Sequence, residues 1–482
     1  MGGRIALIGA GAVVALVAWR AAGPAPSVAS GAQAPRHRAP PPPADVRDIP
    51  ASAALAVEAS GAAKADPSSP VADSDRATPP PANHQERSTD ASPIAAGTLA
   101  REDIGRARAL IAERQFIDAE ALLRRAWESP EHRAQAAADL WSLYRRPGFS
   151  IKADAEQVSQ LLRRLGPEFR RHETPGFVVL SDAPARWVEE RAAQLERARS
   201  DFFRVMKKMN VHARPHQRKL LCVLFDDPES YRRFAREEDG VTAEWVAGYY
   251  ASRANRVVSY NDARDPTIEQ ARAQAEALLG RVAKWRSDAH EADRRGDAAG
   301  ATRLRKSADD AEAEIKRATA RVDAAARASA SAKLVHEAVH LLAYNTGVQR
   351  PGREYPFWLT EGLATSFEGG AAGGGAGGPD RSAGLESRRR TVRDLAASGR
   401  LAPIEALVSA RGALAWSAAE AESMYAQSAA LFRVLYRRDP LALGQYLQTL
   451  GDANGPSTPN DRLALFVEAF GNPASIDLAS ER

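Results

Sequence analysis

Two stretches of the chain show an unbroken helical alternation of apolar and polar positions. Between residues 267 and 292, and again between residues 304 and 325, apolar or small side chains recur every three or four positions, with Gly296 and Gly300 in the interruption. This spacing places the recurring side chains on one face of a helix. It predicts an antiparallel helical hairpin over residues 267–330, each arm about 40 Å long at about 1.5 Å per residue.

Helical spacing also marks the segments on either side of a short β-rich region. This spacing occurs over residues 98–172 and again over residues 388–450. Within the first of these segments, residues 107–126 resemble one tetratricopeptide-like helix pair. Units of this kind need about three copies to be stable alone. We therefore expect residues 98–172 to pack on a neighbouring domain as a helical segment.

Continuous apolar runs predict a small sheet in the middle of the chain. The runs at Phe177–Leu180 and Leu220–Phe225 are typical of buried strands, and residues 184–209 between them have helical spacing. Two shorter β segments, Val246–Tyr250 and Val257–Tyr260, are separated by SRANR, which indicates a hairpin. The sequence therefore predicts an α+β fold that is helix-rich overall and contains a small mixed sheet.

The candidate chemistry lies in the sequence LVHEAVHLLAYN at residues 334–345. Residues four apart share one face of a helix, so His336 and His340 can direct their imidazoles at one point with Glu337 beside them. This HExxH spacing is typical of a zinc site in which the glutamate acts as a base. The alternative is a core helix that carries the same residues for packing or for pairing along its face.

A third zinc ligand is expected from FWLTEGLATSFE at residues 357–368, because catalytic zinc usually takes three protein ligands. Glu361 is the best candidate, since it lies in an apolar segment that predicts a second helix. Glu368 follows two helical turns later on the same face. We expect its carboxylate to accept the spare ring N–H of one histidine and so to fix that histidine's tautomer.

These two motifs resemble the signature helices of the gluzincin metallopeptidases, whose membrane-alanyl-aminopeptidase branch has a very similar second helix. A closer resemblance is to the bacterial domain-of-unknown-function family 1570, which has a peptidase MA-like fold. The resemblance implies that His336, His340 and Glu361 bind Zn²⁺ and that Glu337 is the general base. It extends over residues 177–182, 220–234, 247–262, 336–347 and 424–436.

The same resemblance implies a zincin-like peptidase domain over residues 173–470, with the helical hairpin inserted in it. In such a fold an edge strand runs along the substrate cleft, where Gly248, Tyr249 and Tyr250 would line the cleft and pair with an extended peptide. The alternative is that both tyrosines are half-buried sheet residues. Tyr425 would hydrogen-bond a developing oxyanion, or else be an ordinary core residue.

The first 97 residues predict export. Residues 1–20 combine Arg4 with an apolar run from Ile5 to Trp19, which is typical of either a secretory signal peptide or a short membrane anchor. Residues 21–97 are rich in proline, alanine and serine without apolar periodicity, which predicts a disordered linker. We expect an exported protein of the cell envelope, periplasmic or extracellular, that is either released or tethered to the membrane, and residues 471–482 form a C-terminal tail.

Composition adds two limits. The net charge of the 482 residues is only +5 and shows no basic patch interleaved with aromatic residues, so we expect no nucleic-acid partner. Cys222 is the single cysteine, which allows no internal disulfide.

Two functions fit these observations. The principal hypothesis is a zinc metallopeptidase that acts on a peptide or protein substrate with a zinc-activated water. The alternative is a catalytically inactive envelope scaffold or peptide-binding protein with a vestigial or structural metal site. In the scaffold the hairpin 267–330 binds a protein partner, whereas an inert rigid hairpin is equally compatible with the pattern.

Overall fold

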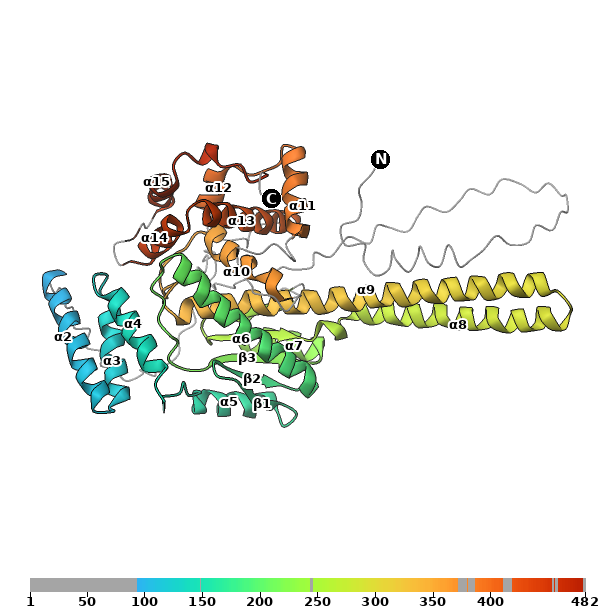
Figure 1. Ribbon diagram of the computed structural model, residues 1–482, viewed down its shortest axis with the longest axis horizontal. Helices are drawn as coiled ribbons and strands as arrows, with labels where there is room; N and C mark the ends of the chain where they lie inside the picture. The colour runs from blue at the N-terminus through green and yellow to red at the C-terminus, as the bar shows by residue number, and fades with distance from the viewer. Residues whose placement is uncertain are drawn as a thin grey trace, which may run out of the picture. The chain divides into compact units, whose positions relative to one another are not determined.

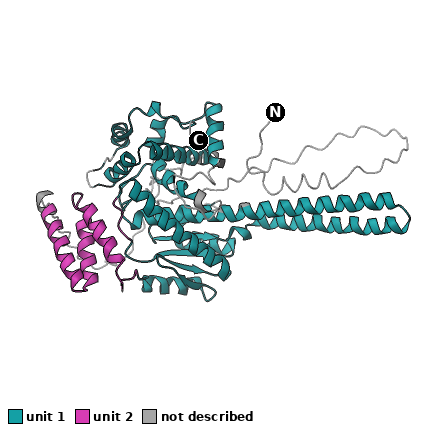
Figure 2. Ribbon diagram, viewed as in Figure 1, with its two compact units in different colours: residues 1–55, 152–211, 216–482 teal, residues 56–151, 212–215 magenta. Residues whose placement is uncertain are grey.

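Helices make up most of the structure, a computed structural model that describes residues 93–147, 149–242, 246–371, 379, 386–410, 418–452, 455 and 458–479. The expected signal peptide or anchor and nearly all of the expected linker lie outside these residues. Within them, the chain separates into two units, one of residues 93–151 and 212–215 and one of residues 152–211 and 216–479 (Figure 2). None of the described helices is both long and apolar enough to cross a membrane.

The smaller unit consists of three helices, α2 (Pro93–Ala112), α3 (Phe116–Trp127) and α4 (Arg133–Tyr144). Their apolar faces meet in one core, which contains Leu123 and Leu140 at 0% exposure. The indole N–H groups of Trp127 and Trp141 donate to the carbonyls of His212 and Ala213, at 2.7 and 3.0 Å. These bonds explain why a short segment from far along the chain belongs to this unit.

The division between the units falls earlier than the expected boundary at residue 172. Helix α5 (Ala155–Leu165) and strand β1 (Arg170–Glu173) belong to the larger unit. Strand β1 has the sequence RRHE, which carries no apolar signal, and it forms by pairing antiparallel with β2. The expected boundary was placed after α5 and most of β1 because helical spacing alone cannot separate α5 from the helices before it, and β1 gives no strand signal.

The larger unit contains one five-stranded mixed sheet in the order β1-β2-β3-β5-β4. The three central strands are parallel, and the two outer strands are antiparallel to their neighbours. Every residue of the central strands is buried, which is why β3 and most of β2 are continuous apolar runs, while β5 also buries the polar Arg256 and Ser259. The remaining strands are β2 (Phe177–Ser181), β3 (Leu220–Phe225), β4 (Gly248–Ala251) and β5 (Arg256–Tyr260).

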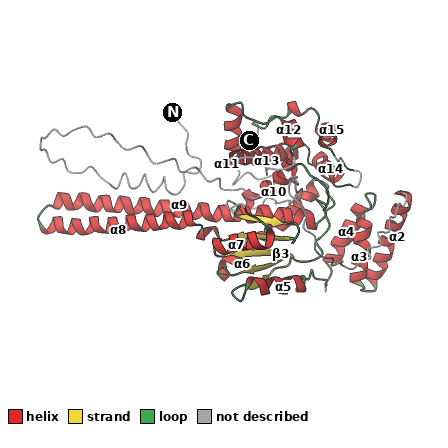
Figure 3. Ribbon diagram, turned by 180° about the vertical axis from the view of Figure 1, so that it is seen from behind, coloured by secondary structure: helices red, strands yellow, loops and turns green. Residues whose placement is uncertain are grey.

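Helices connect and cover the strands, so that the α+β class and the small mixed sheet are confirmed. Helix α6 (Ala185–Lys208) joins β2 to β3, and α7 (Pro228–Asp239) follows β3 (Figure 3). Cys222 is fully buried in β3, and burial raises the pKa of its thiol well above the ordinary value. This thiol is therefore a packing group rather than a reactive one.

The expected helical hairpin follows β5 and the short 3₁₀ turn η1 (Asp262–Arg264). It consists of α8 (Pro266–Arg294) and the first part of α9 (Ala298–Asn345), which lie side by side over the length of α8 (Figure 1). Leu278 and Val282 of α8 meet Ile315 of α9 in the buried seam between the arms. The turn between them is closed by Asp297, whose carboxylate accepts the Gly300 N–H at 2.8 Å.

Helix α9 continues without a break from the hairpin into the body of the larger unit. Its C-terminal half packs on β4, β5 and α6 and carries the HExxH residues. Where it enters the body, the Ser331 hydroxyl accepts hydrogen bonds from Arg191 Nη1 and Gln194 Nε2 of α6, at 2.6 and 3.0 Å. This buried contact fixes α9 to α6 five residues before His336.

Among the described residues that follow α9, six further α-helices belong to the larger unit, and α10 packs between α9 and α13. At Gly362 of α10 the approach to α13 is so close that a Cβ would lie 2.5 Å from the Ser428 carbonyl oxygen. The helices are α10 (Phe357–Ala371), α11 (Glu386–Ala397), α12 (Ile404–Ser409), α13 (Ala418–Arg438), α14 (Pro440–Gly451) and α15 (Pro459–Phe470), followed by η2 (Pro473–Ser475).

Candidate metal centre

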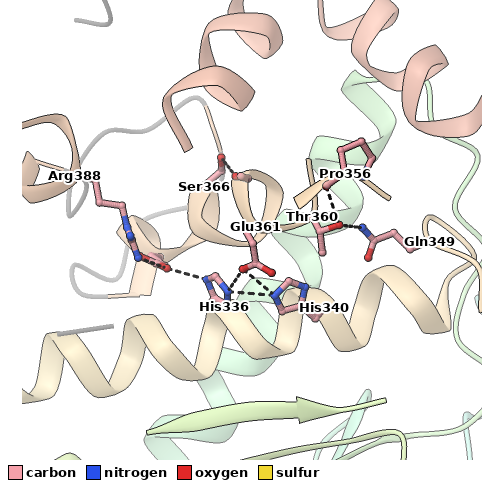
Figure 4. A network of polar contacts seen from close by, with 10 residues as sticks. His336, His340, Gln349, Pro356, Thr360, Glu361, Ser366 and Arg388 are labelled. Carbon is pink, nitrogen blue, oxygen red and sulfur yellow. Dashed lines mark hydrogen bonds and ion pairs between the residues drawn. The ribbon is translucent and has the colours of Figure 1, made fainter. Parts of the chain in front are cut away.

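Helices α9 and α10 bring the three expected ligands together (Figure 4). His336 Nε2 lies 3.0 Å from Glu361 Oε2 and 3.2 Å from His340 Nε2, and His340 Nε2 lies 3.5 Å from Glu361 Oε2. All three side chains are buried, with the residues at 2%, 2% and 3% exposure. In the part of the chain that the structure describes, they form the one group of three such residues close enough to hold a metal ion.

The spacing of these three donor atoms fits a tetrahedral metal. Zinc bonds of about 2.0 to 2.1 Å at tetrahedral angles separate neighbouring ligand atoms by roughly 3.3 Å. The observed separations of 3.0, 3.2 and 3.5 Å bracket that value. Two imidazoles and one carboxylate also match the donor set of open, three-ligand zinc sites.

Glu368, the third glutamate of the two motifs, lies behind His336. His336 Nδ1–H donates to Glu368 Oε1 at 2.8 Å, which leaves Nε2 facing His340 and Glu361. Glu368 is 8% exposed and lies on the same face of α10 as Glu361, as the seven-residue spacing predicts. The hydrogen bond holds the ring in the orientation and tautomer that a metal ligand requires.

Electrostatics at the centre favour a cation. Burial raises the pKa of Glu361, but the facing histidines His340 and His336 outweigh burial and lower its pKa to about 2. Burial lowers the pKa of His336, yet its hydrogen bonds to Glu361 and Glu368 raise it to about 10. The carboxylates thus stay ionised and hold positive charge between them, the role that a divalent metal fills when it binds.

Glu337 has an unusual environment for a carboxylate. The residue is 0% exposed, and neither of its oxygens makes a hydrogen bond of normal geometry within the described residues. Burial raises the pKa of Glu337 to about 7, although His336 and His340 and the Tyr250 backbone amide act against it. The Glu337 oxygens, buried beside the candidate ligands and without a hydrogen bond of normal geometry, are thus available to a further polar group such as a water molecule.

Tyr425 of α13 lies next to this centre. Its ring centroid is 6.3 Å from that of His336 and 5.2 Å from that of Phe357, and the residue is 2% exposed. Burial, followed by the charges of Glu361 and Glu337, raises its pKa well above the ordinary value of 10. The phenol therefore stays protonated and remains a hydrogen-bond donor.

The three expected cleft residues lie in β4, which is an outer strand of the sheet and packs against α9. Their rings serve sheet packing: the Tyr249 hydroxyl donates to Asp239 at 2.8 Å, and the Tyr250 ring stacks on Tyr344 at 5.6 Å. The tyrosines are 1% and 5% exposed, so they are more deeply buried than half-buried sheet residues. What β4, beginning at Gly248, offers near the metal centre is its backbone.

Sequence reasoning missed Arg388, which lies in the first turn of α11. Its guanidinium donates from Nη2 to both oxygens of Glu368 at 3.0 Å, and from Nε at 3.2 Å. It follows Glu368 by twenty residues in the arginine-rich sequence SRRRTVR, where no spacing distinguishes one arginine from the next. The one indication in the sequence was that Glu368, if buried, would need a positively charged partner.

Comparison with known proteins gives one match. Residues 330–455 match the model of a family described as "Protein of unknown function (DUF1570)". This segment contains the three ligands, Glu337, Glu368, Arg388 and Tyr425. Searches of curated proteins and of solved structures found no match.

Proposed function

We propose that this protein is a zinc-dependent metallopeptidase of the gluzincin type, in which residues 330–455, the segment that matches the DUF1570 model, contain every residue of the metal centre. One observation carries the proposal. Two imidazoles and a carboxylate converge at tetrahedral spacing, and the unbonded carboxylate of Glu337 lies beside them. A zincin-like fold, a peptide or protein substrate and zinc as the metal are parts of the same proposal.

The residues of the centre have distinct roles in this mechanism. His336, His340 and Glu361 would hold the metal, which would supply the Lewis acidity that polarises a peptide carbonyl and acidifies a water molecule. Glu337 accepts the proton from that water and passes it to the departing amine. Burial raises the pKa of the Glu337 carboxyl, which makes this carboxylate a stronger base than an exposed one.

Two further groups support the reaction. The Tyr425 phenol, kept protonated by burial, donates to the oxyanion that develops on the scissile carbonyl. The outer strand β4 pairs with the extended substrate through its backbone, with Gly248 at its start. Export to the cell envelope is proposed from the apolar run at residues 5–19 alone.

The proposal is tested by Glu337→Gln, which keeps the shape of the side chain and removes its basicity. We expect the purified variant to bind one zinc per chain, as the wild type does, and to lose peptide hydrolysis by at least about 100-fold in a broad peptide-library assay. The matched control is Glu468→Gln, at an exposed glutamate of α15, which should leave both properties unchanged. Wild-type turnover in Glu337→Gln contradicts the assigned role.

A cell-envelope scaffold is the second candidate, and the hairpin favours it. The arms α8 and α9 bury their apolar seam against each other and leave a long charged outer surface available to a partner. In that case the metal site is vestigial or structural. Metal-free wild-type protein that captures an envelope partner supports the scaffold, and zinc at one per chain together with peptide cleavage supports the enzyme.

A further inference from the structure

Arg388 connects three parts of the metal centre. Its guanidinium binds both oxygens of Glu368, whose Oε1 accepts the His336 Nδ1–H. The same guanidinium lies over the ring of Tyr425, with 5.8 Å between its central carbon and the ring centroid. One side chain thus contacts the carboxylate that orients a ligand and the aromatic ring beside that ligand.

The surroundings make this contact strong. The side chains of Arg388 and Glu368 are 10% and 9% exposed, so water screens their attraction little. A planar guanidinium can hold both carboxylate oxygens in one orientation, which a lysine ammonium cannot do. Glu368 accepts from Arg388 through both oxygens and from His336 through Oε1, so one carboxylate holds both side chains.

The position of Arg388 in the fold adds a second consequence. It lies on α11, which packs against α13, whereas Glu368 lies on α10 and Tyr425 on α13. The guanidinium therefore joins α11 to both neighbouring helices at the metal centre. Movement of α11 away from α10 would release Glu368 and, through it, the His336 ring.

We propose that Arg388 is a positioning residue for the metal centre, which holds Glu368 so that His336 presents Nε2 to the metal. The inference rests on the proposed metal site, but it does not depend on peptide hydrolysis. It makes a specific claim about metal affinity: the chain of contacts Arg388–Glu368–His336 sets how tightly zinc is bound. Removal of an outer-sphere partner of a ligating histidine typically weakens metal affinity by about 10- to 100-fold.

The test compares the zinc affinity of three full-length variants by competition with a chromophoric chelator. Arg388→Met removes the charge and the hydrogen bonds while keeping an unbranched apolar stem, and we expect affinity to fall by about 10- to 100-fold. Arg388→Lys restores the charge without the planar fork, so we expect it to recover part of the loss. The control is Arg390→Met, at an exposed arginine of the same helix, which should match the wild type.

A second readout separates positioning from a general loss of structure. With chelator present, far-ultraviolet circular dichroism and the thermal midpoint compare the metal-free variants. The visible spectrum of the Co²⁺-substituted protein reports the ligand geometry. A folded Arg388→Met with weaker binding and an altered cobalt spectrum supports the inference. Should Arg388→Met fail to fold, Arg388→Lys decides, since wild-type affinity in that variant would overturn it.

The outcomes also distinguish the inference from the proposed function. Equal zinc affinities for Arg388→Met and Arg390→Met contradict the role of Arg388 and leave the peptidase proposal intact. Wild-type protein that binds zinc but cleaves no peptide contradicts the peptidase proposal only. Wild-type protein that binds no zinc contradicts both.

Discussion

At the scale of single residues, the metal centre follows from spacing within helices. Residues i and i+4 of α9 supply two imidazoles, and residues i and i+7 of α10 supply one ligand and the carboxylate behind His336. Both relations depend only on the period of the helix, so the sequence was sufficient to predict them. The pairing of the two helices was predicted only through the need for a third ligand.

Residues whose roles depend on tertiary contacts were harder to predict. Period-two alternation assigns Tyr249 and Tyr250 to opposite faces of β4, but it does not reveal that α7 and α9 cover those faces. Asp239 at the end of α7 accepts the Tyr249 hydroxyl, and Tyr344 of α9 stacks on Tyr250. Arg388 was missed for the same reason, because its partner is distant in the sequence.

The prediction for a single residue concerns Glu361 and its effect on zinc affinity. Replacing it by alanine removes one of three ligands and the only ligand carboxylate, so we expect zinc affinity to fall by more than about 100-fold, beyond the loss typical of outer-sphere changes. Chelator competition measures the change. Glu422→Ala, at an exposed glutamate of α13, is the control. Full zinc occupancy in Glu361→Ala at the wild-type affinity would show that another residue is the third ligand.

At the scale of secondary-structure elements, buried apolar strands and the long alternating helices were predictable, whereas the polar outer strand β1 was not. Strands β2, β3 and β5 are buried throughout, and the apolar runs of β2 and β3 indicated this directly, whereas the buried Arg256 and Ser259 of β5 carry no such signal. Strand β1 has mostly exposed polar side chains and exists because its backbone pairs with β2. A sequence pattern reports side-chain burial, so a strand held by backbone pairing alone leaves no such signal.

The position of α10 depends on one glycine. A Cβ at Gly362 would lie 2.5 Å from the Ser428 carbonyl oxygen and 2.7 Å from the Phe432 Cβ, so α10 can approach α13 this closely only without a side chain there. Glu361 is the preceding residue. The close packing of these helices therefore fixes the depth at which the ligand carboxylate lies.

The role of Gly362 can be tested by comparing its substitution by alanine with the same substitution at an exposed glycine. Gly362→Ala should destabilise the protein by about 1 to 3 kcal/mol through overpacking and weaken zinc binding, because α10 must shift. Gly280→Ala in α8, where a Cβ would meet nothing within 4 Å, should stabilise the protein by about 1 kcal/mol through helix propensity. Thermal unfolding and chelator competition measure both effects. Equal behaviour of the two variants would mean that close packing at Gly362 does not position Glu361.

At the scale of the whole molecule, the hairpin and the metal centre share helix α9. Its distal half contacts α8, and its proximal half contacts the sheet, α6 and α10. Within the proximal half, Ser331 accepts buried hydrogen bonds from Arg191 and Gln194 of α6. The continuity of the hairpin arm with the HExxH helix was predictable, because no glycine or proline interrupts residues 301–345. The attachment of α9 to α6 was not predictable, because it depends on Arg191 and Gln194 of α6. These side chains are polar yet buried, and helical spacing assigns only apolar residues to the buried face of a helix.

This division of α9 predicts that the metal centre does not need the distal hairpin. Deleting residues 273–290 and 303–320 removes about five turns from each arm at about 3.6 residues per turn, so the faces of both helices stay aligned. The native turn at residues 291–302 and the Arg272–Asp323 ion pair at 2.8 Å are retained.

We expect the shortened protein to bind zinc within about twofold of the wild-type affinity, because the contacts that hold His336 and His340 all lie in the proximal half. Peptide hydrolysis should likewise persist if the hairpin is a docking arm, and capture of a partner should be lost. A shortened protein that folds but binds zinc at least about tenfold more weakly would show that the hairpin acts on the centre through α9, as a lever does.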